Sequence, residues 1–109
     1  MVKTKITVDE MLCSYVDELK KQIKLEKVIL YGSRARGDEL KNSDIDLIII
    51  SDDFERFSFL ERLEFLELQW KYSIPIEAIG YTAKEYEEMS GKIGIISEVG
   101  KYGKEIYIS

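Results

Sequence analysis

Apolar residues recur along this chain in short runs that are rich in β-branched side chains. Runs of this kind, bounded by polar or turn-forming residues, are typical of buried strands. They predict strands at residues 27–31, 44–50 and 74–81, and a terminal strand or extended tail at 105–108. The run at 47–50 is the most apolar in the chain. The chain therefore supplies three or four strands.

Between these runs the apolar positions recur every three or four residues, which is typical of amphipathic helices. Thr7 and Glu10 have the spacing of a capping box, in which each side chain bonds the backbone N–H of the other residue. The apolar positions that follow predict a first helix that packs against the sheet, with Val8, Leu12, Val16, Leu19 and Ile23 on one face.

A second capping box, Ser58 to Glu61, predicts another helix. Its expected shared face consists of Leu60, Leu63, Leu66 and Trp70. Further apolar residues widen this surface beyond a narrow stripe, namely Phe59, Phe65 and Leu68. The extra surface either meets a partner or is buried on two sides of the helix.

A third capping box at Thr82 to Glu85 predicts a short helix that Gly91 ends. The spacing of Ile93, Ile96 and Val99 predicts one more helix, ending near Gly103. Strands that alternate with helices indicate a layered α/β or α+β fold, with helices packed on a mixed β-sheet.

Length and charge narrow the class of protein. The 109 residues suit one domain, spanning 1–109, and leave no room for a second substrate-binding domain. The net charge of −5 argues against nonspecific binding to DNA or RNA, which depends on a cationic surface. The N-terminus lacks an apolar signal-peptide region, and no apolar stretch approaches transmembrane length, so we expect a cytoplasmic protein.

The chain has no histidine and one cysteine, Cys13. Serine–histidine and cysteine–histidine catalysis and histidine-ligated zinc are therefore excluded, which leaves carboxylates as the main candidates for metal binding and proton transfer. Cys13 cannot form an internal disulfide. Its apolar neighbours Met11, Leu12 and Val16 predict a buried side chain.

Gly32 and Ser33 directly follow the first predicted strand. A glycine at this position lets the backbone approach a ligand closely, and the free N–H groups of a helical turn beginning at Ser33 would face phosphate oxygens. Arg34 and Arg36 add positive charge. Alone, a Gly-Ser after a strand is usually only a turn.

Asp44 and Asp46 begin the most apolar strand. Side chains alternate along a strand, so both carboxylates are expected on one face, opposite Ile45 and Leu47. Two like charges this close need a cation, and Mg²⁺ suits them because it takes hard oxygen ligands together with substrate phosphates. An isolated Asp-x-Asp is more often solvated or capping. Combined with the Gly-Ser turn, it indicates a metal-bound polyphosphate site.

Gly32, Ser33, a ten-residue spacer, Asp44 and Asp46 together resemble the signature of the DNA polymerase beta nucleotidyltransferase superfamily. Residues 28–50 are similar to the minimal nucleotidyltransferase (MNT) proteins, many of which are antitoxins of HEPN/MNT toxin–antitoxin modules. The resemblance is dense across 28–50, extends as a pattern to about residue 103, and implies the nucleotidyltransferase fold.

The same resemblance implies a third carboxylate on a later strand. Glu77 is the only acidic residue in the run at 74–81, and alternation places it with Ile79 on the face opposite Ile76 and Ala78. The family position is more usually aspartate. The simpler alternative is an edge strand that begins at Pro75 and turns Glu77 toward water.

By this resemblance, Asp44, Asp46 and Glu77 bind one or two Mg²⁺ ions, and Gly32 and Ser33, with Arg34 and Arg36, hold the phosphates of ATP. The implied reaction is transfer of AMP to a tyrosine hydroxyl of a HEPN toxin. Two alternatives stay open. One is an antitoxin that inhibits its partner by occlusion alone, and the other is an aminoglycoside-type nucleotidyltransferase, which usually needs a larger protein.

Overall fold

The computed structural model describes residues 7–31, 45–90 and 103–108. Three α-helices, one 3-10 helix and four strands lie within these ranges. In chain order they are α1 (Val8–Gln22), β1 (Lys27–Tyr31), β2 (Ile45–Ile50), the 3-10 helix η1 (Asp52–Arg56), α3 (Phe59–Leu68), β3 (Ile76–Tyr81), α4 (Ala83–Ser90) and β4 (Lys104–Ile108). The predicted terminal strand is therefore confirmed, whereas the helix predicted from Ile93, Ile96 and Val99 lies outside the described residues.

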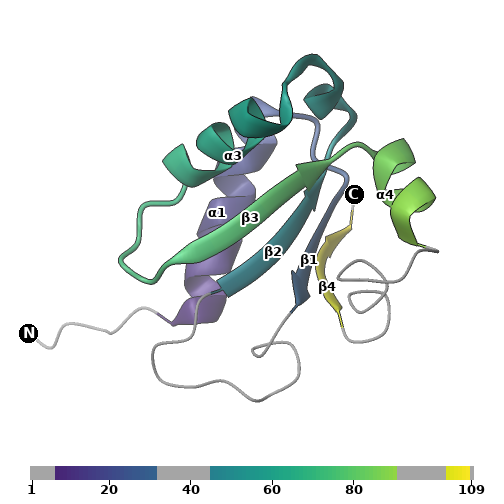
Figure 1. Ribbon diagram of the computed structural model, residues 1–109. Helices are drawn as coiled ribbons and strands as arrows, with labels where there is room; N and C mark the ends of the chain where they lie inside the picture. Colours follow the sequence, from purple (N-terminus) through teal and green to yellow (C-terminus); the bar gives the residue numbers. More distant parts are fainter. Residues whose placement is uncertain (1–6, 32–44, 91–102, 109) are drawn as a thin grey trace, which may run out of the picture.

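The four described strands form one sheet in the order β3-β2-β1-β4 (Figure 1). β1 runs antiparallel to both of its neighbours, β2 and β4, whereas β2 and β3 run parallel. The parallel pair requires a crossover, which η1 and α3 provide. The sheet is mixed and carries helices, so the predicted α+β fold is confirmed.

One face of the sheet packs against α1 and α3, and we call it the helical face. Its core combines side chains of β1 and β2 with those of the two helices. Tyr15 of α1 is buried and donates a hydrogen bond of 2.7 Å from its hydroxyl to the Leu66 carbonyl of α3, which ties the helices together. The buried apolar residues of this face include Leu12, Leu19, Val28, Ile45, Leu47, Ile49 and Leu66.

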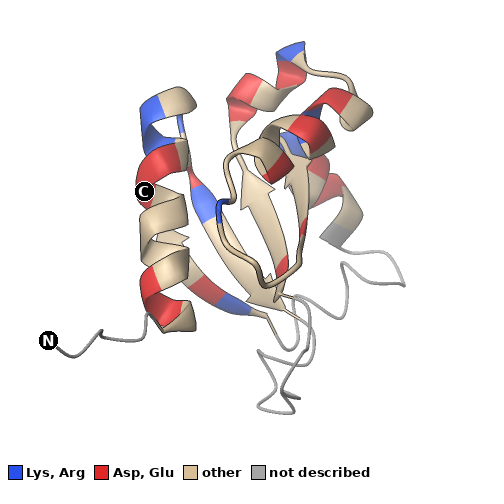
Figure 2. Cartoon of the chain, turned by 90° about the vertical axis from the view of Figure 1, so that its left-hand side faces the viewer, with Lys and Arg blue, Asp and Glu red and all other residues tan. Residues whose placement is uncertain are grey.

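The opposite face carries a smaller cluster, and α4 covers only part of it. Residues of α4 pack against the apolar side chains of this cluster, which are Ile29, Tyr31, Ile48, Ile50 and Tyr81. We call this side the α4 face. Figure 2 shows α1 and α4 on opposite sides of the sheet.

All three predicted capping boxes form. In the first two, each side chain accepts a hydrogen bond from the other residue's backbone N–H, so both helix starts have satisfied donors. At the start of α4, Glu85 accepts from the Thr82 N–H at 2.9 Å and Thr82 accepts from the Glu85 N–H at 3.1 Å. The sequence pattern therefore located these helix starts correctly.

The face predicted for α3 is partly wrong. Leu66 is buried as expected, but Leu60 is 66% exposed, and the second buried residue of the helix is Arg62. Arg62 donates to the Gly80 and Phe57 carbonyls and forms a bidentate ion pair with Glu85, with N–O distances of 2.6 and 3.3 Å. Because the buried guanidinium has oxygen partners, an arginine can occupy a core position of this helix. The spacing of apolar residues alone did not predict a buried side chain at position 62.

The prediction that Cys13 is buried is also wrong, because its side chain is exposed. The buried stripe of α1 runs through Leu12, Tyr15, Val16 and Leu19, and Cys13 lies beside it. Among the described helices, none is both long and apolar enough to cross a membrane.

Candidate active site

Asp46 is the second residue of β2 and lies on the α4 face. Its neighbours Ile45 and Leu47 are fully buried on the helical face, so alternation turns the half-buried Asp46 side chain the other way. The predicted separation of carboxylate and apolar positions is confirmed for this residue.

Glu77 is the second residue of β3, and the parallel register pairs it directly with Asp46. Paired residues on neighbouring strands point to the same face, and such strands lie about 4.8 Å apart. The carboxylates of Asp46 and Glu77 therefore project side by side. Glu77 is exposed and β3 is the outer strand of the described sheet, so the edge-strand alternative was right about its exposure.

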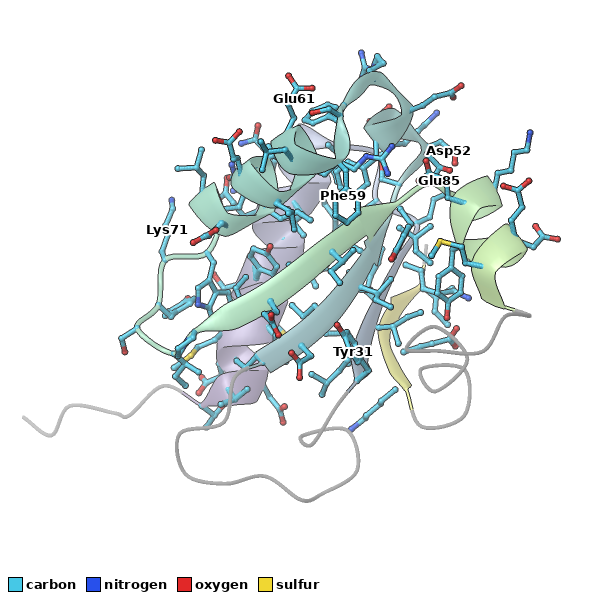
Figure 3. The ribbon with its side chains drawn as sticks, in the orientation of Figure 1. Tyr31, Asp52, Phe59, Glu61, Lys71 and Glu85 are labelled. Atoms are coloured by element: carbon cyan, nitrogen blue, oxygen red, sulfur yellow. The ribbon has the colours of Figure 1, made fainter. Side chains whose placement is uncertain are left out.

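Tyr31 extends this arrangement to a third strand. It is the last residue of β1, pairs with Asp46 across the antiparallel ladder, and is buried. Tyr31, Asp46 and Glu77 thus form a row across β1, β2 and β3, which we call the site row. Figure 3 labels Tyr31 at the end of the sheet where this row lies.

The electrostatics of Tyr31 reflect its place beside the carboxylates. Burial, as the largest cause, together with the negative charges of Asp46 and Glu77 and a smaller contribution from Tyr81, raises the pKa of Tyr31 to about 12. The phenol therefore stays protonated at neutral pH. Sequence reasoning missed this residue, although its position between an apolar strand and the Gly-Ser turn was a usable signal.

Five of the predicted site residues lie outside the described residues: Gly32, Ser33, Arg34, Arg36 and Asp44. Covalent connection still limits where their segment attaches. The described chain stops at Tyr31 and resumes at Ile45, and both residues belong to adjacent strands at the end of the sheet that carries the site row. The structure thus brings Asp46 and Glu77 together and leaves the other five as predictions.

The donor chemistry of the site row fits a hard divalent cation. Two carboxylates side by side supply oxygen ligands and negative charge, which Mg²⁺ prefers over nitrogen or sulfur ligands. Within the described ranges no group of three or more Asp, Glu, His or Cys residues is placed so that it could hold a metal ion. The remaining predicted ligand, Asp44, lies one residue before the described start of β2.

Comparison with known protein families identifies the class of protein. The nucleotidyltransferase domain family matches residues 12–102, which is most of the chain. This chain belongs to the nucleotidyltransferase domain family. The resemblance predicted from the Gly-Ser and Asp-x-Asp motifs is therefore confirmed.

Several relatives come from the archaeon Methanocaldococcus jannaschii. The protein named "Putative protein adenylyltransferase MJ0141" is 32% identical over 99 residues, which cover 84% of this chain and 94% of that protein. "Putative protein adenylyltransferase MJ1379" is 36% identical over 66 residues, or 61% of this chain and 66% of that protein. "Putative protein adenylyltransferase MJ0604" is 36% identical over 87 residues, covering 77% and 79% of the two chains.

Solved structures share the fold. A crystal structure named as a putative nucleotidyltransferase from Sulfolobus solfataricus superimposes with a TM-score of 0.69 at 22% identity, covering 99% of this chain and 92% of that one. A crystal structure of a toxin-antitoxin with AMP-PNP has a TM-score of 0.63 at 18% identity, covering 94% and 75%. A mutant of the toxin-antitoxin MntA-HpeT has a TM-score of 0.57 at 18% identity, covering 86% and 70%.

Proposed function

We propose that this nucleotidyltransferase transfers AMP from ATP to a hydroxyl group of a partner protein, and that the partner is a HEPN-type toxin which the transfer silences. The observation that carries the proposal is the register of β2 and β3, which sets Asp46 beside Glu77. These carboxylates lie at the end of the sheet to which the Gly-Ser segment is covalently attached. The names of the relatives support AMP transfer to protein, and the toxin-antitoxin neighbours support the kind of partner.

In this proposal one group of residues binds the metal and another binds the phosphates. Asp44, Asp46 and Glu77 would hold Mg²⁺, which when bound neutralises charge on the phosphates and on the attacking and leaving oxygens. Gly32 and Ser33 would hold the triphosphate through backbone N–H groups, assisted by the positive charges of Arg34 and Arg36.

The reaction is an in-line displacement at the α-phosphorus. The acceptor oxygen forms the new P–O bond, the bond between the α-phosphorus and the bridging oxygen to the β-phosphorus breaks, and pyrophosphate leaves. The hydroxyl proton passes to a carboxylate, for which Glu77 is the exposed candidate on the outer strand. Tyr31 stays neutral beside the carboxylates because its pKa is raised to about 12.

A second candidate function is inhibition by occlusion, with little or no transfer. Two points favour it: the family resemblance implies an aspartate at the position that Glu77 takes, and α3 exposes large apolar side chains that a bound partner would cover. These are Phe59, Leu60 and Leu68, at 51%, 66% and 76% exposure.

One experiment separates the two functions. The purified protein is incubated with Mg²⁺, ATP labelled in the α-phosphate and the protein encoded by the neighbouring gene, and label on that protein and released pyrophosphate are measured. We expect transfer by the wild type and a loss of at least about 100-fold in Asp46→Asn, because the variant removes a carboxylate from the site row.

The matched control is Asp17→Asn, which makes the same change at an exposed position on α1. It should transfer label at the wild-type rate. Full transfer by Asp46→Asn would refute the assignment of the site. A stable complex that forms without label, and equally well in Asp46→Asn, would support occlusion instead.

A further inference from the structure

A groove runs between α3 and the outer edge of β3. Its volume is about 310 Å³, and it is lined by Phe59, Leu63 and Glu67 of α3 and by residues 76–79 of β3. We call it the edge groove. Figure 3 shows the Phe59 side chain between α3 and β3, where it borders this space.

The strand that borders the edge groove is open to pairing within the described sheet. β3 is the last strand in the order β3-β2-β1-β4, and β2 is its only described neighbour. An edge strand presents backbone N–H and C=O groups that can pair with an added strand from another protein. The edge groove therefore has the form of a site for an extended peptide segment.

The lining of the edge groove indicates the chemistry of such a segment. Most lining residues are apolar, which favours apolar side chains in the bound segment. The charged lining residues are Glu67 and Glu77, both acidic, and no lysine or arginine is among the residues that line the groove. A segment that also carries lysine or arginine would thus complement the groove in charge.

The edge groove is continuous with the site row. Glu77 lines the groove and is also the direct partner of Asp46 across the sheet. A segment lying along residues 76–79 therefore passes beside the carboxylates that the proposed function places at the reacting phosphate. This continuity distinguishes it from the second described groove, which α1 and β4 form away from the site row.

We infer that the edge groove docks the acceptor protein through an extended segment that is apolar, carries lysine or arginine, and pairs with the edge of β3. Docking there brings the acceptor hydroxyl to Asp46 and Glu77. The inference rests on the proposed function for the identity of the acceptor, but the docking itself is measured independently of catalysis.

A pair of charge-reversal variants on α3 tests whether the charge of the edge groove contributes to docking. Glu67 lines the groove, whereas Glu64 is exposed on the same helix and does not. With the neighbouring gene's protein as acceptor, Glu67→Lys should raise the acceptor KM at least about tenfold and leave kcat and the affinity for ATP unchanged. Glu64→Lys should change the acceptor KM less than about twofold, because rim charges away from the contact contribute little.

A pair of truncated apolar side chains on α3 tests whether packing in the edge groove contributes to docking. Phe59→Ala removes a groove-lining ring that is 51% exposed, and Leu68→Ala removes a side chain that is 76% exposed on the same helix but outside the groove. Calorimetric titration of the acceptor into each variant should show a loss of affinity of about tenfold or more for Phe59→Ala alone. Equal affinities in the two variants would overturn the inference.

Amide hydrogen exchange locates the contact directly. Adding the acceptor should slow exchange in residues 76–79 and in α3. Protection confined to α1 and β4 would overturn the inference and assign docking to the other groove. A groove variant that changes self-association of this chain, measured by sedimentation, would show that the groove binds a second copy and would likewise overturn it.

The outcomes separate this inference from the proposed function. If the groove variants weaken binding while Asp46→Asn transfers label normally, the docking surface stands and the catalytic assignment fails. If Asp46→Asn abolishes transfer while the groove variants bind and transfer like the wild type, the catalytic assignment stands and the docking surface fails. If the wild type does not bind the acceptor at all, the docking inference is wrong.

Discussion

The two faces of the sheet differ in burial and polarity, and β2 shows the difference most clearly. On the helical face, Ile45, Leu47 and Ile49 are all fully buried against α1 and α3. On the α4 face, Ile48 and Ile50 are buried at one end of the strand, whereas Asp46 at the other end is half-buried and polar. The helical face of β2 is apolar throughout, whereas its α4 face changes from apolar to acidic along the strand.

This difference follows from how far each face is covered. α1 and α3 cover the helical face of β2, so Ile45, Leu47 and Ile49 have no contact with water and only apolar side chains are favourable there. α4 covers only the part of the opposite face near Tyr81 and Ile50, with Ala83, Tyr86 and Met89 in contact. The end of this face that the described helices leave uncovered can therefore keep Asp46 and Glu77 hydrated and accessible to a ligand.

The largest stability difference should come from two neighbouring residues of β2 that point to opposite faces. Leu47→Ala should lower the free energy of unfolding by about 2–5 kcal/mol, because it leaves a cavity at a fully buried position. Asp46→Asn should change it by no more than about 0.5 kcal/mol, although we expect it to lower transfer at least about 100-fold. Urea denaturation followed by circular dichroism measures both. A comparable loss in the two variants would show that the site row is structural.

A smaller effect on stability is expected where η1 packs against β3. A Cβ added at Gly80 would lie 2.8 Å from Cε2 of Phe54, whose ring is fully buried. Gly80→Ala should therefore destabilise the fold by about 1–3 kcal/mol through overpacking.

A double variant checks the cause of this effect. If the clash with the ring is responsible, Phe54→Leu should make room, and Gly80→Ala should cost less in that background than in the wild type. Thermal unfolding of the two single variants and the double variant gives the coupling. Strict additivity would mean that the loss does not arise from contact with Phe54.

The smallest effect concerns the ion pair that anchors α4 over the covered end of the sheet. Hydrogen bonds from Arg62 and from the Thr82 backbone hold the pKa of Glu85 below its ordinary value of 4.5. The ionised Glu85 side chain is therefore more favourable in the folded protein than in the unfolded chain. This stabilisation is present above pH 4.5 and is lost as the pH falls through the lower, folded pKa.

Glu85→Gln should consequently lower stability at pH 7 by only about 1 kcal/mol, because the carboxylate is 41% exposed and screened by solvent. The difference from the wild type should shrink toward zero as the pH falls below 4.5. Denaturation midpoints at several pH values measure this. A difference that stays constant down to acidic pH would indicate lost packing instead of lost charge.

Local patterns predicted the elements because their causes are local. A capping box involves residues three apart, and strand alternation involves immediate neighbours, so both are written in adjacent positions. The helix starts at Thr7, Ser58 and Thr82 and the opposite faces of Asp46 and Leu47 were accordingly correct. The candidacy of Glu77 came instead from the resemblance to a family.

Predictions that depended on distant partners fared worse. Leu60 is exposed and Arg62 buried because Gly80 and Glu85, about twenty residues further along the chain, supply oxygens for the guanidinium. No spacing within α3 reveals those partners. Cys13 was misplaced for a related reason, since its apolar neighbours did not show where the sheet would contact α1.

By itself, the sequence determined which segments form helices and strands, which side chains alternate to opposite faces, and which residue types are available for phosphate and metal chemistry. Only the tertiary structure decided the strand order, the parallel pairing of β2 with β3, and hence that Tyr31, Asp46 and Glu77 meet in one row. The physical reason is range: periodicity arises from bonded neighbours, whereas register arises from segments that are separate in the chain and meet only when the core assembles.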